Sequence, residues 1–222
     1  MNVKSGKRLL LPAGVKHSEI QVLNSRFIAS IAPAFSVEEA RAFIASIRAL
    51  HPDATHHVPA FIIGHGASTI EHCSDDGEPA GTAGRPALAV LKGSGLGDVV
   101  VVVTRYFGGT KLGTGVLVRA YSDAVRAVLA DLPLAEKIAT YTVSLVIPYA
   151  LYDRIRLLIQ AHSGRVLSED FAADITLELL FPVEHFASFQ DALQELSKGV
   201  LRAEIIASNE DTIFPLDQNL DI

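Results

Sequence analysis

DVVVVVTRYFGGTKLGTGVLVRAYSDAVRAVLADL, residues 98–132, places an apolar run, a glycine-rich loop and a periodic apolar stripe in succession. The five consecutive valines, 99–103, have no polar face, so they predict a central strand covered on both sides. The glycines that follow permit positive φ angles and close backbone approach. From Val116 to Leu129, apolar side chains recur with the period of a buried helix face. The stretch therefore predicts a strand, a tight loop and a helix at the centre of the fold.

The loop between this strand and this helix is the best candidate for a binding site. A helix start offers free N–H groups and the positive end of the helix dipole, and both favour anions. Arg105 and Lys111 would add positive charge beside it. The same glycines also suit a tight strand-to-helix turn that requires small residues. An anion site and a purely structural turn are both compatible with the sequence.

The glycine spacing resembles that of a P-loop, but the sequence excludes a P-loop. Gly108 and Gly113 are correctly spaced, but Thr114 stands where the lysine belongs. Tyr106 and Phe107 would either stack on nucleotide bases or pack in the core behind the strand. The candidate binding residues of this region are Arg105, Tyr106, Gly108, Gly109, Lys111, Gly113, Thr114 and Arg119.

A second segment rich in turn-forming residues, DDGEPAGTAGRP, covers residues 75–86. Its three carboxylates would suit a hard cation or acid–base chemistry. Their spacing matches no EF-hand loop, however, and no second cluster of metal ligands accompanies them. We therefore favour a solvated turn, with an ion pair from one of these acids to Arg85, Arg105 or Lys111. The carboxylates, which are also candidate binding residues, belong to Asp75, Asp76 and Glu78.

Thr82 and Arg85 lie near a predicted helix start and form a second candidate anion contact, although Thr82 would equally serve as the N-cap. The histidines show neither an HxH nor an HExxH pattern, so we expect no metal site and no cofactor. Cys73 is the single cysteine, and we expect its thiol to be packed and inert. No nucleophile–base pair stands out, so an enzymatic function is not favoured.

The charge distribution indicates a domain boundary near Leu134. Residues 1–134 carry 13 Lys and Arg against 11 Asp and Glu, whereas residues 135–222 carry 6 against 14. An acidic surface repels phosphate backbones, so any RNA binding is expected to be weak and confined to the first domain. That binding would be aided by Lys4, Lys7, Arg8 and Lys16. No apolar run is long enough for a membrane span or a signal peptide, so we expect a soluble cytoplasmic protein that binds no membrane. The oligomeric state stays open.

Periodicity predicts two α+β domains. In the first, a helix begins at Ser36, where Glu39 completes a capping box. Two further helices begin near Thr82 and after the glycine loop. The expected strands cover residues 19–23, 26–32, 58–63, 69–73 and 99–103. In the second domain the order of elements is βαββαβ, which is the ferredoxin-like split unit.

The two motifs, DDGEPAGTAGRP at 75–86 and RYFGGTKLG at 105–113, together resemble the IMPACT family, also called YigZ-like proteins. The segment SRFI at 25–28 and His56 match the family as well. Bacterial members are similar over the whole chain, including a ferredoxin-like C-terminal domain. The resemblance implies a first domain folded like the second domain of the small-subunit ribosomal protein five group. It also implies a second domain like the last domain of elongation factor G.

The resemblance also implies a role near translation. Eukaryotic relatives restrain a starvation-activated translation kinase by competing for its activator protein, but they carry a different partner domain that the C-terminal half here does not match. We therefore expect a non-enzymatic regulatory module that binds RNA or a protein partner, such as the ribosome or a translation-associated protein, through the glycine-loop site. The alternative is an enzyme or sensor for a small phosphorylated ligand bound at residues 105–115.

Overall fold

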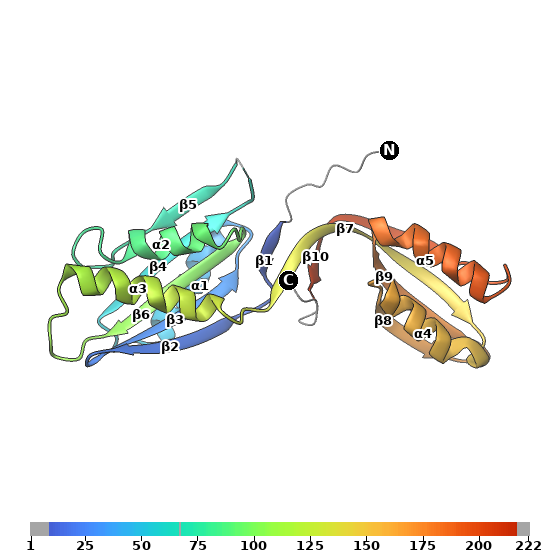
Figure 1. The fold of residues 1–222 in the computed structure, drawn as a ribbon, viewed down its shortest axis with the longest axis horizontal. Coiled ribbons are helices and arrows are strands. Elements are labelled where there is room, and N and C mark those ends of the chain that lie inside the picture. Colours follow the sequence, from blue (N-terminus) through green and yellow to red (C-terminus); the bar gives the residue numbers. More distant parts are fainter. Residues whose placement is uncertain (1–8, 67, 217–222) are drawn as a thin grey trace. The chain divides into compact units, whose positions relative to one another are not determined.

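Figure 1 shows a computed structural model, which describes residues 9–66 and 68–216. The chain forms two compact units. Of the described residues, the first unit contains those up to Glu136 and again Phe214–Leu216, and the second contains Lys137–Ile213. The boundary expected at Leu134 coincides with the first residue of strand β7 (Leu134–Ile147), which passes from the first unit into the second. The return of the chain to the first unit at Phe214 has no counterpart in the sequence patterns.

The first unit is built on an antiparallel sheet with the strand order β2-β3-β6-β4-β5. Its strands are β2 (Lys16–Val22), β3 (Ser25–Pro33), β4 (His56–Ile63), β5 (Ile70–Cys73) and β6 (Val99–Tyr106). The valine strand β6 is the middle strand, and all five valines are fully buried, as predicted. The sheet therefore extends to either side of the residues that the sequence placed at its centre.

Helices cover both faces of this sheet. α2 (Gly84–Gly93) and α3 (Thr114–Leu129) lie side by side on one face, and α1 (Val37–Leu50) covers the other (Figure 1). The odd-numbered valines of β6 pack in the core under α2 and α3, whereas Val100 packs in the core under α1. Side chains of a strand alternate between its two faces, which is why an unbroken apolar run is required here.

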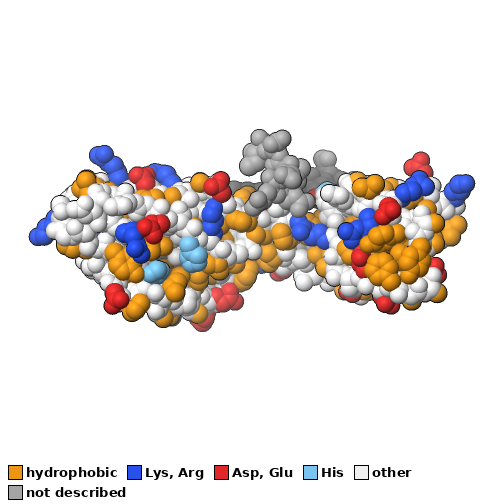
Figure 2. All heavy atoms as spheres, turned by 90° about the horizontal axis from the view of Figure 1, so that it is seen from below, with side chains coloured by type: hydrophobic (Ala, Val, Ile, Leu, Met, Phe, Trp, Pro, Cys, Tyr) orange, Lys and Arg blue, Asp and Glu red, His pale blue; other side chains and the backbone are white. Residues whose placement is uncertain are grey.

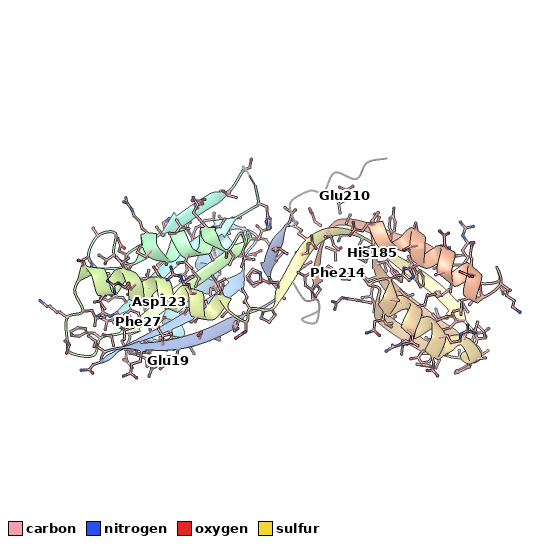
Figure 3. All side chains as sticks on the ribbon, in the orientation of Figure 1. Glu19, Phe27, Asp123, His185, Glu210 and Phe214 are labelled. Carbon is pink, nitrogen blue, oxygen red and sulfur yellow. The ribbon has the colours of Figure 1, made fainter. Side chains whose placement is uncertain are left out.

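Three contacts illustrate how local sequence and packing fix this unit. Ser36 Oγ accepts the Glu39 N–H at 3.1 Å, so α1 begins at its predicted cap. Glu39 Oε2 accepts the Phe35 N–H at 2.8 Å, which completes a reciprocal capping arrangement. Phe27 of β3, labelled in Figure 3, packs edge-on against Tyr121 of α3 with ring centroids 5.2 Å apart.

The second unit has the predicted βαββαβ order of elements. After β7 come α4 (Tyr152–Ala161), β8 (Arg165–Phe171), β9 (Ile175–Pro182), α5 (Val183–Leu196) and β10 (Glu204–Pro215), with a short 3-10 helix (Tyr149–Leu151) before α4. β7 lies between β9 and β10, and β8 is the outer strand beside β9, which is the ferredoxin-like arrangement. The short strand β1 (Leu10–Pro12) pairs with the start of β7.

The core of the second unit consists of the alternating apolar residues of the strands and one face of each helix. Phe181 of β9 stacks on Phe189 of α5 with ring centroids 4.2 Å apart. The pairing of β8 with β9 shifts between Val166 and Ser168, so Leu167 is an extra residue in the edge strand and is half exposed. Among the described residues, no helix is long and apolar enough to cross a membrane.

Candidate functional site

The two motif segments meet at one end of the first sheet, where a buried network centred on Glu78 joins them. Glu78 Oε1 accepts hydrogen bonds from Arg105 Nη1 at 2.5 Å and from the Tyr121 hydroxyl at 2.7 Å. Arg105 Nη2 also donates to Ser25 Oγ at 3.3 Å. The Glu78 and Arg105 side chains are only 4% and 5% exposed. The network thus connects the loop before α2, the end of β6, the start of β3 and the middle of α3.

The ion pair changes the role that the sequence predicted for Arg105. An ion pair between an acid of the first motif and a base of the second was expected, and Glu78 with Arg105 forms it. The guanidinium also lies over the rings of Phe27 and Phe107, at 5.4 and 5.5 Å from their centroids. Its charge is therefore neutralised inside the protein, and the expectation that Arg105 is a counter-charge for an external anion is wrong.

Tyr121 is the member of the network that sequence reasoning missed as a site residue. Burial, followed by the Glu78 carboxylate, raises the pKa of the Tyr121 hydroxyl well above its ordinary value, so the hydroxyl stays protonated and donates. A tyrosine on the buried stripe of a helix was the available signal, because a buried hydroxyl needs a partner. The identity of that partner, 43 positions earlier in the chain, carried no local signal.

Asp75 occupies the start of α2. Its Oδ1 accepts the N–H groups of Ala83 at 3.1 Å and Gly84 at 2.9 Å, and its Oδ2 accepts that of Gly81 at 2.7 Å. Burial acts to raise the pKa of the Asp75 carboxyl, but these three donors together with Arg85 outweigh it and lower the pKa. The anion-binding property of this helix start is thus satisfied by the protein's own carboxylate.

The prediction of Thr82 as the N-cap is wrong. Ala83 is the cap residue of α2, and the buried Thr82 hydroxyl donates to the Pro79 carbonyl at 2.7 Å. Arg85 is exposed in the first turn of the helix. The proposed anion contact from Thr82 and Arg85 is therefore not assembled, since Thr82 faces its own turn and the nearby amides bind Asp75.

Asp76 attaches the same loop to α1 and β4. Its Oδ1 pairs with Arg48 Nη2 at 2.5 Å, its Oδ2 accepts the His57 N–H at 2.7 Å, and its carbonyl oxygen bonds to His56 Nδ1 at 2.7 Å. Asp75, Asp76 and Glu78 thus each bind a different set of protein groups. No cluster of three potential metal ligands occurs in the part of the chain that the structure describes. The expectation of a solvated turn is wrong for Glu78, whose carboxylate is buried.

The pKa values of two other groups near the site, His57 and Cys73, are shifted by their surroundings. Burial lowers the pKa of His57, with Asp76 raising it and Arg48 lowering it further. Burial, with Asp75 next, raises the pKa of the Cys73 thiol, so the thiol is protonated and weakly reactive. His57 Nδ1 lies 3.2 Å from the Thr104 hydroxyl, which fixes the ring against β6.

The glycines of the second motif allow the backbone to form the tight turn between β6 and α3. A Cβ atom on Gly108 would overlap the Asn24 carbonyl group, so only glycine fits against that chain segment. Gly109 and Gly113 have φ angles of +82° and +76°, a region that favours glycine. The structural interpretation therefore accounts for these three positions. α3 then begins at Thr114 without a side-chain cap.

The remaining candidates lie on the loop and on the first two turns of α3. Lys111, Thr114 and Arg119 are exposed, and Phe107 is 45% exposed. Tyr106 behaves differently from both expectations, because its ring lies beneath the guanidinium of Arg26 at 4.6 Å and its hydroxyl bonds to His51 at 2.9 Å. We call the exposed residues of 77–81 and 107–115 the loop surface.

Fold and site together define a class, namely two-domain proteins with an Impact-type first domain. Residues 23–129 match the Impact N-terminal domain, and residues 145–200 match a Domain of unknown function (DUF1949). The chain is 39% identical over 194 residues to the IMPACT family member YigZ of Escherichia coli (strain K12), covering 87% of this chain and 95% of that relative. The chain belongs to the IMPACT family.

A solved structure with a TM-score above 0.5 agrees with this assignment. This structure, described as the crystal structure of a hypothetical protein, is 38% identical, covers 91% of this chain and 98% of its own, and has a TM-score of 0.59. Another, of the two-domain translational regulator Yih1, is 30% identical, covers 53% of this chain and 47% of its own, and has a TM-score of 0.38.

Proposed function

We propose that this chain is a translation-linked regulatory module that binds a protein partner through the loop surface. Membership of the IMPACT family supports the link to translation, since the resemblance implies that eukaryotic relatives restrain a translation kinase by competing for its activator protein. The single observation that carries the proposal is the buried Glu78–Arg105–Tyr121 network, which holds both family motifs at one end of the sheet. A preformed surface loses little conformational entropy when it binds.

A protein is favoured over RNA for two reasons. On the face shown in Figure 2, Lys and Arg side chains are scattered among acidic ones instead of forming a basic stripe, and a stripe is what phosphate backbones require. The uncovered face of the second sheet presents Thr142, Ser144, Ser168 and Glu178. These residues include no aromatic ring on which a base could stack, and the cation Arg165 lies on the same face together with the acidic Glu178 and Asp170. The basic residues Lys4, Lys7 and Arg8 lie outside the described part of the chain.

A small phosphorylated ligand is the alternative, and the geometry does not favour it. Arg105 is neutralised by Glu78, and the start of α2 is filled by Asp75. A thermal-shift panel of nucleotides and sugar phosphates tests this alternative. We expect no shift at millimolar ligand. A shift that Lys111→Ala abolishes and Lys198→Ala preserves would favour the alternative instead.

Sedimentation of cell extract on a sucrose gradient tests the proposal. We expect the full chain and its Lys198→Ala control to co-migrate with a larger complex, and the double variant Phe107→Ala, Lys111→Ala to remain in the light fractions. Nuclease treatment separates the two partner classes, because a protein complex survives it. A full chain that never co-migrates with any complex, at low or high salt, would contradict the proposal. Co-migration lost on nuclease treatment would assign the surface to RNA.

A further inference from the structure

The groove between α2 and α3 is a second interaction surface, separate from the loop surface. We propose that it receives an acidic amphipathic helix of a protein partner. This inference goes beyond the proposed function and uses different residues, so either can fail alone. An amphipathic helix lying in an apolar groove is a recurrent mode of recognition.

The groove is shaped by small side chains. It has a volume of about 810 Å³ and runs along the outer junction of the two helices. The residues without long side chains that line it are Gly81, Ala89, Gly93, Ser94, Ser122 and Ala130. Between them lie Pro86, Val90, Val118 and Leu129, which make the lining predominantly apolar. Because the distance between packed helices depends on the side chains at the contact, this lining allows a third helix to approach both α2 and α3 closely.

The charged residues that line the groove indicate which kind of helix it can bind. The lining contains two charged residues, Arg85 on α2 and Arg126 on α3, and no carboxylate. Arg126 pairs with Asp123 just outside the groove at 2.7 Å, but both side chains are more than half exposed, so a partner's carboxylate can replace Asp123 at little cost. Arg85 lies in the first turn of α2, where the helix dipole disfavours a cation. Two arginines over an apolar floor are complementary to an apolar helix face flanked by acids.

Among the described residues, a second copy of this chain does not offer such a helix. Its acidic helix is α5, whose exposed side bears Glu184, Asp191 and Glu195. The apolar side of α5, including Phe189 and Leu193, is fully buried in the core of the second unit. The acidic and apolar faces of α5 are therefore not available together, and we assign the occupant to another protein.

Nuclear magnetic resonance of the isotope-labelled full chain tests this inference with three synthetic peptides of about four helical turns. The first has leucines on one face and glutamates on its flanks, the second has lysines in place of the glutamates, and the third is a scrambled version of the first. We expect the acidic peptide to shift the amides of α2 and α3, and the other two to bind about tenfold more weakly or not at all.

Charge reversal in the groove provides the matched variants. The double variant Arg85→Glu, Arg126→Glu should bind the acidic peptide about tenfold more weakly and the lysine peptide more tightly, whereas Arg154→Glu on α4 should change neither. Ala89→Glu, on the exposed floor, should also weaken the acidic peptide. If the double variant fails to fold, the comparison of peptides on the unaltered chain and the Ala89→Glu result decide the question.

Four results would overturn the inference. The acidic peptide would leave α2 and α3 unshifted at millimolar concentration, or the lysine peptide would bind as tightly. The groove amides would shift on concentrating the chain alone, which would assign the groove to a second copy. They would shift with an oligouridine in place of the peptide, which would assign it to RNA. None of these outcomes alters the sedimentation result expected for the loop surface.

Discussion

Glu78 Oε1 and Arg105 Nη1 lie 2.5 Å apart in the interior of the first unit, although the two residues are 27 positions apart and belong to different motifs. Taking two charges out of water is costly, and additional hydrogen bonds must offset that cost. Tyr121 donates to the carboxylate, and the Ser25 hydroxyl accepts from the guanidinium. The geometry of both motif loops therefore depends on one buried and hydrogen-bonded charge pair.

Removing one partner of this pair should strongly destabilise the folded protein. Glu78→Gln leaves the Arg105 guanidinium buried beside a neutral amide, so we expect a loss of about 3–5 kcal/mol in the free energy of unfolding. Urea denaturation at neutral pH measures it. Asp123→Asn, which breaks the exposed pair with Arg126, is the control and should cost less than about 1 kcal/mol. Equal losses of unfolding free energy in the two variants would show that the buried pair contributes no more to stability than the exposed pair.

Asp75→Asn should reduce stability in a pH-dependent way. The folded protein lowers the pKa of this carboxyl below its ordinary value near 3.8, so its contribution is present above that pH and is lost as the pH falls through the folded pKa. At neutral pH we expect the substitution to cost about 2–3 kcal/mol, because charged acceptors form strong hydrogen bonds. Urea curves at pH 7 and pH 3 should show the gap between the two proteins narrowing under acid. A constant gap would contradict this role.

His57 should make the protein sensitive to mild acid. Burial lowers its pKa below the ordinary 6.5, so below that pH the unfolded chain takes up a proton that the folded chain does not. Stability should therefore decline as the pH falls from about 6.5 toward the folded pKa. His57→Gln should lower the urea midpoint at pH 7.5 but flatten its dependence between about pH 6.5 and 5, while the exposed His72→Gln should leave that dependence unchanged. If His57→Gln left the pH dependence of the urea midpoint unchanged, His57 would not be the group that causes the acid sensitivity.

Two glycines of the same loop region should respond in opposite ways. Gly108→Ala places a Cβ atom against the Asn24 backbone, and we expect a loss of about 2 kcal/mol or more. Gly115 lies in the first turn of α3 with open space around it, so Gly115→Ala should gain about 0.5–1 kcal/mol from helix propensity and reduced unfolded-state entropy. Thermal unfolding of both variants measures the difference. A destabilised Gly115→Ala would contradict this account of the first turn of α3.

Local patterns were sufficient for much of the fold. The cap of α1 involves residues three positions apart. The valine run alone predicts that both faces of β6 are covered. The order of elements in the second unit followed from alternation and helix periodicity alone. These signals work because each is contained within a few consecutive residues.

The site was less predictable, because its partners are distant in sequence. The cap of α2 comes from Asp75, eight positions before Ala83, so the nearer Thr82 was the wrong choice. Arg105 could have been placed correctly, since it continues the row of odd-numbered β6 residues that face the core under α2 and α3. Its position beside glycines suggested a ligand instead. The partner of Tyr121 required the three-dimensional structure.

The extra residue in β8 has a consequence for the protein at high concentration. Leu167 and Phe171 of this outer strand are half exposed, and Figure 2 shows hydrophobic side chains gathered on one face of the second unit. A flat outer strand with such side chains would be a template for fibre growth, and a bulge interrupts the regular spacing of backbone groups that a stacking chain needs. The sheet is thus protected by an irregularity in addition to the charged residues Arg165, Glu169 and Asp170 of the same strand. Shortening the strand by that one leucine should turn a dispersed protein into one that aggregates.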